Sequence, residues 1–386
     1  MATETPPVVV EIDSLAAGGD GVGRLADGRV VFVPWTAPGD QVLVRLTEER
    51  KRFARGEVSE VLRPSPDRRS PPCPIAGECG GCAWQHIDYP AQLAAKAGIL
   101  RDAIERIAGL TSPAEIPVRS ATELGYRSRA RVFAQAGEVG FRRMRSHEVC
   151  GTQACPVLVP ELNAVLGNLA QAPPEGEAEW LLAVGDGGEV SIRVDGPGAK
   201  ASAIHLRVGE DPLRIGPGVF FQANAALRGQ LAQAVGEACG RGERVLELYA
   251  GAGFFTLGLG RAFAQVTAVE SNRRAARDLG HNLSAADVPA DVAIHPIPTE
   301  DYLADPRGPR PDVVLLDPPR TGLPKGGPEA LAALGAERIV YVSCDPATLA
   351  RDLRILTERG YRLSALTAFD LFPQTPHIEA LAILTL

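Results

Sequence analysis

Residues 244–263 read RVLELYAGAGFFTLGLGRAF and carry the signals of a strand, a tight turn and a helix in succession. The apolar run that begins at Val245 indicates a buried strand, and the glycines after it allow a sharp turn into the helix. Because glycine has no Cβ, Gly251 and Gly253 also let a ligand approach the backbone, which indicates a cofactor loop. A dinucleotide loop would have its third glycine at position 256, which is Thr256, and this argues against NAD.

The C-terminal part of the chain continues this alternation of buried strands and helices. Strands are indicated by QVTAVES, VAIHPIP, PDVVLLDPP, RIVYVSCDP, YRLSALTAFD and EALAILTL. This order predicts an α/β fold with a doubly wound, mostly parallel sheet over residues 213–386. Glu270 lies 19 residues after Gly251 at the end of the next strand, where a carboxylate can bind two ribose hydroxyls.

The N-terminal part has a different pattern. Residues 1–63 contain several short strand signals separated by glycine turns, which predict a small β-barrel of the oligonucleotide-binding type. The proline-rich segment RPSPDRRSPPCP indicates a linker. Residues 64–212 are predicted to form a β-rich central domain, with one amphipathic helix at YPAQLAAKAGILRDAIERIAG and another near 158–170.

The charge of the chain is unevenly distributed. The 386 residues have a net charge of −7, which taken alone argues against a nucleic-acid partner. Residues 41–70, however, have a net charge of +3 and residues 119–145 have +5, so the remainder carries −15. Arginine, which binds phosphate in a bidentate manner, supplies most of this positive charge. A biased genome composition would produce the same excess of arginine, so both interpretations stay open.

Membrane and export signals are missing from the sequence. No apolar stretch approaches 18 residues, which excludes a transmembrane helix. The first residues, MATETPPVVVEIDS, lack the pattern of a secretory signal, so we expect a cytoplasmic protein. Nothing in the sequence indicates an obligate protein partner.

Seven cysteines indicate metal binding or catalysis more than disulfides, because their number is odd and no export signal accompanies them. Cys73, Cys79 and Cys82 form a cluster whose thiolates suit either an iron–sulfur cluster or structural zinc, and spacing alone does not choose between them. Cys239 falls in a helix-like run, LAQAVGEACG, and is expected in the core.

The segment RIVYVSCDPATLARDL places Cys344 between a buried strand and a helix. Asp345 is a favourable N-cap and Pro346 a favourable first helical residue. Ligands bind at the carboxyl ends of parallel strands, and a helix N-terminus favours a thiolate. We therefore expect Cys344 to be a nucleophile.

Two carboxylates accompany Cys344 in the sequence pattern. Glu379 follows the proline-rich loop DLFPQTPH and is flanked by apolar residues, so partial burial would raise its pKa and make it a serviceable base. Asp317 ends the strand VVLLDPPR, beside two prolines. This DPP motif is similar to the amine-binding D/N-P-P-aromatic motif of amino-methyltransferases, although Arg320 stands where the aromatic residue would be.

These motifs together resemble those of the RNA 5-methyluridine methyltransferases, in particular the bacterial 23S rRNA branch. The resemblance is carried by SCDPATLARDL, FPQTPHIE, LELYAGAGFF, VLLDPPRTGL and VFFQAN at 219–224. It implies a class I fold that uses S-adenosylmethionine, with Cys344 adding to C6 of a uracil and Glu379 removing the C5 proton. The positions that match cofactor-binding residues of the family are Gln222, Tyr249, Gly251, Gly253, Glu270 and Asp317.

The resemblance extends to the rest of the chain. Residues 7–63 resemble a TRAM domain, which implies that the barrel binds RNA. Cys73, Cys79, Cys82 and Cys155, the last in CPVLVP, resemble the ligands of the 4Fe–4S cluster of the 23S rRNA branch, with Cys150 as a rival fourth ligand. The implied partner is therefore RNA, 23S rRNA before tRNA.

Three other interpretations remain open. A tRNA uridine-C5 methyltransferase shares the catalytic motifs, but the bacterial tRNA enzymes usually lack the barrel and the cysteine cluster. Methylation of an exocyclic amine through the DPPR motif would leave Cys344 and Glu379 unused. A non-catalytic RNA-binding or assembly factor would have no need of the Cys/Glu pair.

Overall fold

The N-terminal strands close into a small barrel in the computed structural model, which describes residues 6–194, 201–209 and 211–386. Its strand order is β1-β2-β3-β5-β4, and alternate apolar side chains such as Val10, Val31 and Val42 fill its interior. The strands are β1 (Val8–Leu15), β2 (Gly21–Arg24), β3 (Val30–Val33), β4 (Gln41–Glu49) and β5 (Phe53–Arg63). The predicted barrel is confirmed.

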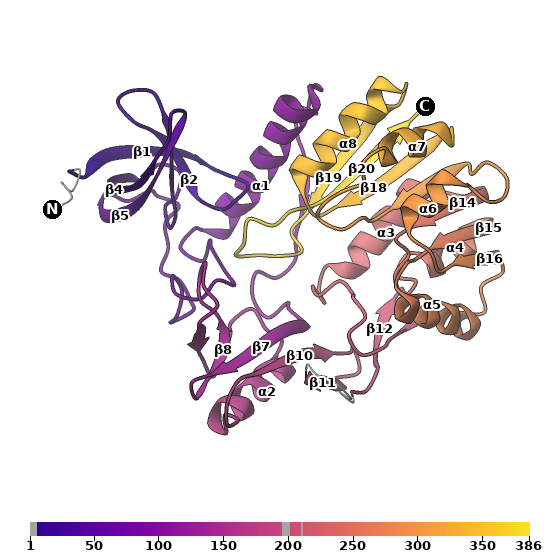
Figure 1. Cartoon of the computed structure of the whole chain (residues 1–386), viewed down its shortest axis with the longest axis horizontal. Coiled ribbons are helices and arrows are strands. Elements are labelled where there is room, and N and C mark those ends of the chain that lie inside the picture. The colour runs from indigo at the N-terminus through magenta and orange to yellow at the C-terminus, as the bar shows by residue number, and fades with distance from the viewer. Residues whose placement is uncertain (1–5, 195–200, 210) are drawn as a thin grey trace.

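A five-stranded antiparallel sheet, ordered β11-β10-β7-β8-β9, forms the second unit (Figure 1). Helix α2 (Pro160–Gln171) covers one face of it, with Leu162 and Leu166 packed against Val132 and Leu182. The strands are β7 (Arg129–Gln135), β8 (Glu138–Arg142), β9 (Val149–Gly151), β10 (Ala178–Val184) and β11 (Val190–Val194). A separate hairpin follows, formed by β12 (Ile204–Val208) and β13 (Asp211–Ile215).

The C-terminal unit is an eight-stranded sheet ordered β16-β15-β14-β17-β18-β20-β19-β6. Its strands pair in parallel except β20, which runs antiparallel to β18 and β19. The strand order reverses between β14 and β17, and such a point is where α/β sheets bind ligands. The strands are β6 (Val118–Arg119), β14 (Gly242–Leu248), β15 (Phe263–Val269), β16 (Asp291–His295), β17 (Val313–Leu316), β18 (Arg338–Ser343), β19 (Arg362–Phe369) and β20 (Glu379–Thr385).

Helices cover both faces of this sheet, so the predicted doubly wound fold is confirmed. One face packs against α3 (Arg228–Cys239), α4 (Thr256–Ala262) and α5 (Arg273–Ala286). The other packs against α6 (Thr299–Ala304), α7 (Gly327–Ala333) and α8 (Pro346–Glu358). Cys239, expected in the core, is buried in α3. Within the described residues, none of the helices is long and apolar enough to cross a membrane.

Part of the segment predicted as the central domain packs on the C-terminal sheet instead. Helix α1 (Tyr89–Ala103), with a π-helical turn η1 (Ile104–Ala108), stands between the barrel and α8 (Figure 1). Its Leu100 and Ile104 share a core with Leu349 and Leu353 of α8. Strand β6 extends the sheet beside β19. Residues 64–212 therefore do not pack as one unit, because the apolar face of α1 is buried against a helix about 250 residues later.

Candidate active site

Strand pairing brings Cys344, Glu379 and Asp317 to one edge of the C-terminal sheet. Cys344 follows the last residue of β18, and Asp317 follows β17, which runs parallel to it. Glu379 is the first residue of β20, which is antiparallel to β18 and pairs Ala380 with Ser343. The start of β20 therefore lies where β18 ends, and the base and the nucleophile predicted from the sequence are neighbours.

Glu379 is a buried carboxyl, with only 2% of its surface exposed. In the described part of the chain its Oε1 has no hydrogen-bond partner. Burial raises the pKa of Glu379 well above its ordinary value, the negative charge of Asp317 raises it further, and Arg320 opposes the shift. Burial also raises the pKa of Asp317, to about 7. A carboxylate in this setting has a high affinity for a proton, as a general base requires.

The thiol of Cys344 is less acidic than its place before α8 predicts. Burial raises its pKa to about 12, with further contributions from the charges of Glu379 and Asp317. Asp345, the N-cap of α8, bonds to N–H groups of the first helical turn. Its Oδ1 accepts the backbone N–H groups of Ala347 at 3.0 Å and Thr348 at 2.9 Å. The free protein therefore holds Cys344 as a thiol at neutral pH.

The glycine loop follows β14, at the point where the strand order reverses, and Glu270 follows the neighbouring strand β15. Glu270 Oε2 accepts the N–H of Gly251 at 2.8 Å, and Oε1 accepts the N–H of Asn272 at 2.6 Å, so the carboxylate is fixed beside the loop. Gly253 has a φ of 98°, and a Cβ there would lie 2.8 Å from Leu279 Cδ1. This position therefore requires glycine. Tyr249, two residues before Gly251, also has a positive φ of 64°, a backbone conformation that is strained for a residue other than glycine.

The segment 219–224 also reaches this loop. Val219 and Phe221 pack in one core with Ala252 and Leu257, and Gln222, which directly follows Phe221, is buried. All six predicted cofactor positions therefore belong to segments that meet at the same edge of the sheet.

Glu247 of β14 is a buried carboxyl near Asp317 and Glu270 to which the sequence pattern assigned no role. Its Oε2 accepts the hydroxyl of Thr256 at 2.6 Å, and among the described residues Oε1 has no partner. Burial raises the pKa of Glu247 to about 8, and the charges of Asp317 and Glu270 raise it too. A carboxylate within an apolar strand, directly before a glycine loop, was the signal that could have identified it.

Four of the cysteines border one cavity of about 310 Å³ outside the C-terminal sheet: Cys73, Cys79, Cys82 and Cys155. Burial raises the pKa of Cys79 to about 11 and that of Cys82 to about 12. The rival Cys150 is buried in β9 instead, with its Sγ 3.9 Å from Oε2 of Glu78. In the part of the chain that the structure describes, no group of three or more Cys, His, Asp or Glu side chains is arranged to hold a metal ion.

The basic segments 41–70 and 119–145 are the first and the second basic segment of this chain. The second lines the same cavity, through Arg127, Arg131, Arg142, Arg143 and Arg145. Arginines of both basic segments pair with carboxylates that lie outside the segments. In residues 119–145, Arg143 pairs with Glu78 at 2.8 Å and Arg145 with Asp20 at 3.2 Å. In residues 41–70, Arg55 pairs with Asp20 at 3.0 Å. The net charges of +3 and +5 therefore both overstate the free positive charge.

Sequence models of three protein families match parts of the chain. The family described as tRNA (Uracil-5-)-methyltransferase matches residues 309–385, and the TRAM domain matches residues 5–59. A third family, described as Conserved hypothetical protein 95, matches residues 224–346.

Similar proteins span nearly the whole chain. An RNA methyltransferase of Streptomyces coelicolor, described as uncharacterized, is 35% identical over 97% of this chain and 92% of its own length. The 23S rRNA (uracil(1939)-C(5))-methyltransferase of Vibrio vulnificus is 33% identical over 97% of this chain and 95% of its own length. The structure of the Pyrococcus abyssi tRNA (uracil-54, C5)-methyltransferase in complex with S-adenosyl-L-homocysteine is 26% identical, with a TM-score of 0.75, and the match covers 98% of this chain and 100% of that chain.

Proposed function

The chain belongs to the RNA uracil-5-methyltransferase family, and we propose that it methylates C5 of a uridine in 23S rRNA with S-adenosylmethionine as the methyl donor. The observation that carries this proposal is the meeting of Cys344 and Glu379 at the sheet edge that also holds the glycine loop. The 23S rRNA enzyme of Vibrio vulnificus, at 33% identity, supports rRNA over tRNA, for which the similar structure is 26% identical.

The reaction needs covalent help because C5 of uracil is a poor nucleophile. The thiolate of Cys344 adds to C6, and the electron pair displaced from the C5–C6 double bond makes C5 a carbon nucleophile. S-adenosylmethionine supplies the methyl group when it is bound. Glu379 then removes the remaining C5 proton, and the electrons of that C–H bond restore the double bond as the sulfur of Cys344 leaves C6.

The residues at the reversal of strand order fit an adenosine-containing cofactor. Glu270 has the carboxylate to accept two ribose hydroxyls, and its position is already fixed by two backbone N–H groups. Gly251 leaves the loop backbone accessible, because nothing lies within 4 Å of the place of a Cβ, and Gly253 lets the loop pack closely on Leu279. Gln222, Tyr249 and Asp317 complete the proposed cofactor set.

The function test is to map 5-methyluridine in total RNA from cells with and without this gene. We expect loss of 5-methyluridine from 23S rRNA, restored by the wild-type gene and not by a Cys344→Ala gene. A loss of 5-methyluridine confined to tRNA would contradict the assignment to rRNA. Unchanged 5-methyluridine in both RNAs would favour the non-catalytic factor instead.

We further propose that the cavity bordered by four cysteines holds a 4Fe–4S cluster. The support is the gathering of four thiols on one cavity of about 310 Å³ and the resemblance of their sequence pattern to that of the 23S rRNA branch. We assign Cys73, Cys79, Cys82 and Cys155 as the ligands. They would hold the cluster next to the arginines of residues 119–145 that line the same cavity.

Anaerobically purified protein should therefore be brown and contain about four iron atoms per chain. Cys155→Ser should lower the iron content, whereas the matched Cys150→Ser should leave it unchanged, because Cys150 lies in β9 and bonds toward Glu78. A colourless preparation that contains zinc would overturn the cluster. Iron lost from Cys150→Ser but kept by Cys155→Ser would overturn the ligand set.

A further inference from the structure

The loop that leads into Glu379, residues 370–378, is held by side chains and backbone from distant parts of the chain. Four consecutive carbonyl groups of this loop accept hydrogen bonds. The donors are Asn224 Nδ2 to Leu371 at 3.1 Å, Lys96 Nζ to Phe372 at 3.0 Å, Tyr126 OH to Pro373 at 3.0 Å, and the backbone N–H groups of Ala83 and Trp84 to Gln374, each at 3.0 Å. The position of the base thus depends on α1 and on the segment after the cysteine cluster.

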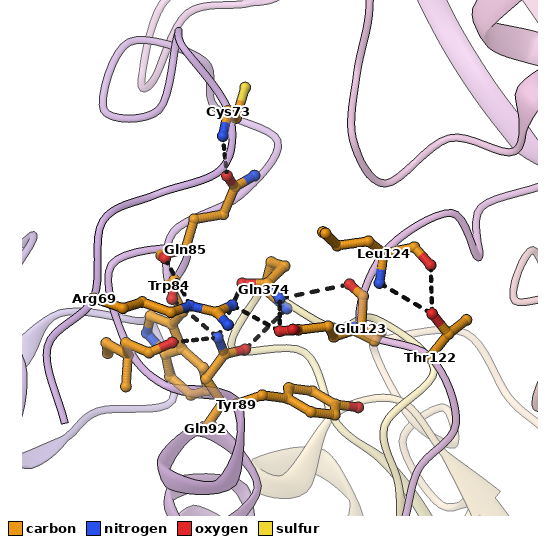
Figure 2. A network of polar contacts seen from close by, with 12 residues as sticks. Arg69, Cys73, Trp84, Gln85, Tyr89, Gln92, Thr122, Glu123, Leu124 and Gln374 are labelled. Carbon is orange, nitrogen blue, oxygen red and sulfur yellow. Dashed lines mark hydrogen bonds and ion pairs between the residues drawn. The ribbon is translucent and has the colours of Figure 1, made fainter.

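Gln374 is the centre of these contacts, as Figure 2 shows. It is fully buried and has a φ of 68°, a left-handed conformation that a non-glycine residue keeps only when its surroundings fix it. Its N–H donates to Gln92 Oε1 at 3.0 Å, and its Oε1 accepts from Gln92 Nε2 at 2.9 Å. The same Oε1 accepts from Arg69 Nη2 at 3.1 Å, and Nε2 donates to Glu123 Oε2 at 3.0 Å.

A charge pair fixes which way the amide of Gln374 points. Arg69 Nη2 bonds to Glu123 Oε2 at 2.7 Å, and this bond holds the pKa of Glu123 below its ordinary value. The amide oxygen therefore faces the cation and the amide nitrogen faces the carboxylate. Arg69 also donates from Nε to the carbonyl of Gln85, whose side chain accepts the N–H of Cys73, so the contacts continue to the cysteine segment (Figure 2).

The chain between Gln374 and Glu379 is stiff. Pro376 restricts it, the hydroxyl of Thr375 donates to the carbonyl of Phe372 at 2.7 Å, and Ile378 is buried. A rigid connection of four residues, 375–378, transmits a displacement of Gln374 to the carboxylate of Glu379 instead of absorbing it. An error of about 1 Å at a reacting group can slow a reaction about 100-fold.

We propose that Gln374 is a positioning residue that aims Glu379 at the C5 proton, an inference that rests on the proposed function. Gln374 does not touch the reacting atoms in this assignment; it acts through the loop. Its loss should therefore slow proton removal and leave the addition of Cys344 to C6 intact, because Cys344 follows β18 and is not part of the loop.

The test uses the direction of the hydrogen bond between Gln374 and Glu123, in which the amide donates and the carboxylate accepts. Gln374→Glu places two carboxylates together and should displace the loop. Combining it with Glu123→Gln restores one amide and one carboxylate in exchanged positions, beside the same Arg69 cation. We expect Gln374→Glu to slow the release of methylated RNA from its adduct with Cys344 about 100-fold. The double variant should recover most of that rate. Tyr361→Phe is the matched control, since it removes one buried hydrogen bond, 2.8 Å to Ala336 O, at the opposite end of β19.

Two RNA substrates separate the steps. RNA with 5-fluorouridine forms an adduct with Cys344 that is not resolved, because C5 carries no proton to remove, so all variants should form it at the wild-type rate. RNA with uridine should give a methylated protein–RNA adduct that accumulates only in Gln374→Glu. If the wild type forms no adduct with 5-fluorouridine RNA, the proposed function fails. If adducts form normally but turnover of Gln374→Glu matches the wild type, or the double variant is no better than the single one, the positioning role fails.

Discussion

Replacing Cys344 by alanine is expected to abolish methyl transfer to RNA, with a loss of at least about 10⁴-fold in rate. Without the thiolate, the C5–C6 double bond keeps its electrons and C5 does not become a carbon nucleophile. The measurement is incorporation of labelled methyl groups into RNA under single-turnover conditions. The variant should also form no adduct with 5-fluorouridine RNA, while its affinity for RNA stays close to that of the wild type.

The control for this substitution is Cys239→Ala, which removes a buried thiol from α3 and should leave the adduct unaffected. A pH series adds a second check. Burial and the neighbouring carboxylates raise the Cys344 pKa to about 12, so below that pH the thiolate fraction grows about tenfold per pH unit. Adduct formation should therefore rise between about pH 6 and pH 9. Full methyl transfer by Cys344→Ala, or an adduct rate that falls with pH, would contradict this assignment.

Local signals in the sequence predicted the strand ends and the helix start that carry the proposed catalytic residues. Cys344 and Asp345 mark the end of a strand and the start of a helix, and each signal involves neighbours in the chain. The same local pattern does not show that burial raises the pKa of the Cys344 thiol. Whether the helix N-terminus acts on the cysteine or on its own N-cap depends on side-chain geometry, and here Asp345 accepts both N–H groups. Sequence spacing does not contain that information.

The sequence pattern does not predict the contacts between segments that lie far apart in the chain. The periodicity of α1 predicts a buried face, yet it does not say that the face packs on α8 or that Gln92 and Lys96 reach the 370–378 loop. Gln374 looks like an ordinary polar loop residue, and only the structure reveals its buried left-handed conformation. Partners separated by about 280 residues leave no trace in spacing or composition.

The net charge of a segment likewise does not show which of its arginines are paired with carboxylates elsewhere in the fold. A segment total counts only the carboxylates within the segment, whereas Arg55 and Arg145 both pair with Asp20 and Arg143 pairs with Glu78, outside the two segments. The arginines that gather around one cavity lie in residues 127–145, in the strands and turns of the central sheet. The cavity with the four cysteines is therefore an expected site of phosphate contact, beside the barrel.

Replacing Glu379 by glutamine is expected to separate the two halves of the reaction. Cys344 should still add to C6 and C5 should still be methylated, but removal of the C5 proton should slow by about 10² to 10⁴-fold. A methylated protein–RNA adduct should therefore accumulate with ordinary uridine RNA, visible as a labelled band that survives denaturing electrophoresis. The addition step should not suffer, because the negative charge of Glu379 is one of the causes that raise the Cys344 pKa.

The matched control is Glu358→Gln, which removes an exposed carboxylate at the end of α8 and should turn over like the wild type. Rapid release of 5-methyluridine RNA by Glu379→Gln would assign the base to another group. Asp317 would then be the first candidate, because burial holds its pKa near 7, within the range of a general base. Absence of any adduct would instead mean that Glu379 is needed before methylation, for example to accept the proton of the Cys344 thiol, whose high pKa requires an acceptor at that edge. Accumulation of the methylated adduct is the one outcome that places Glu379 after the methyl transfer.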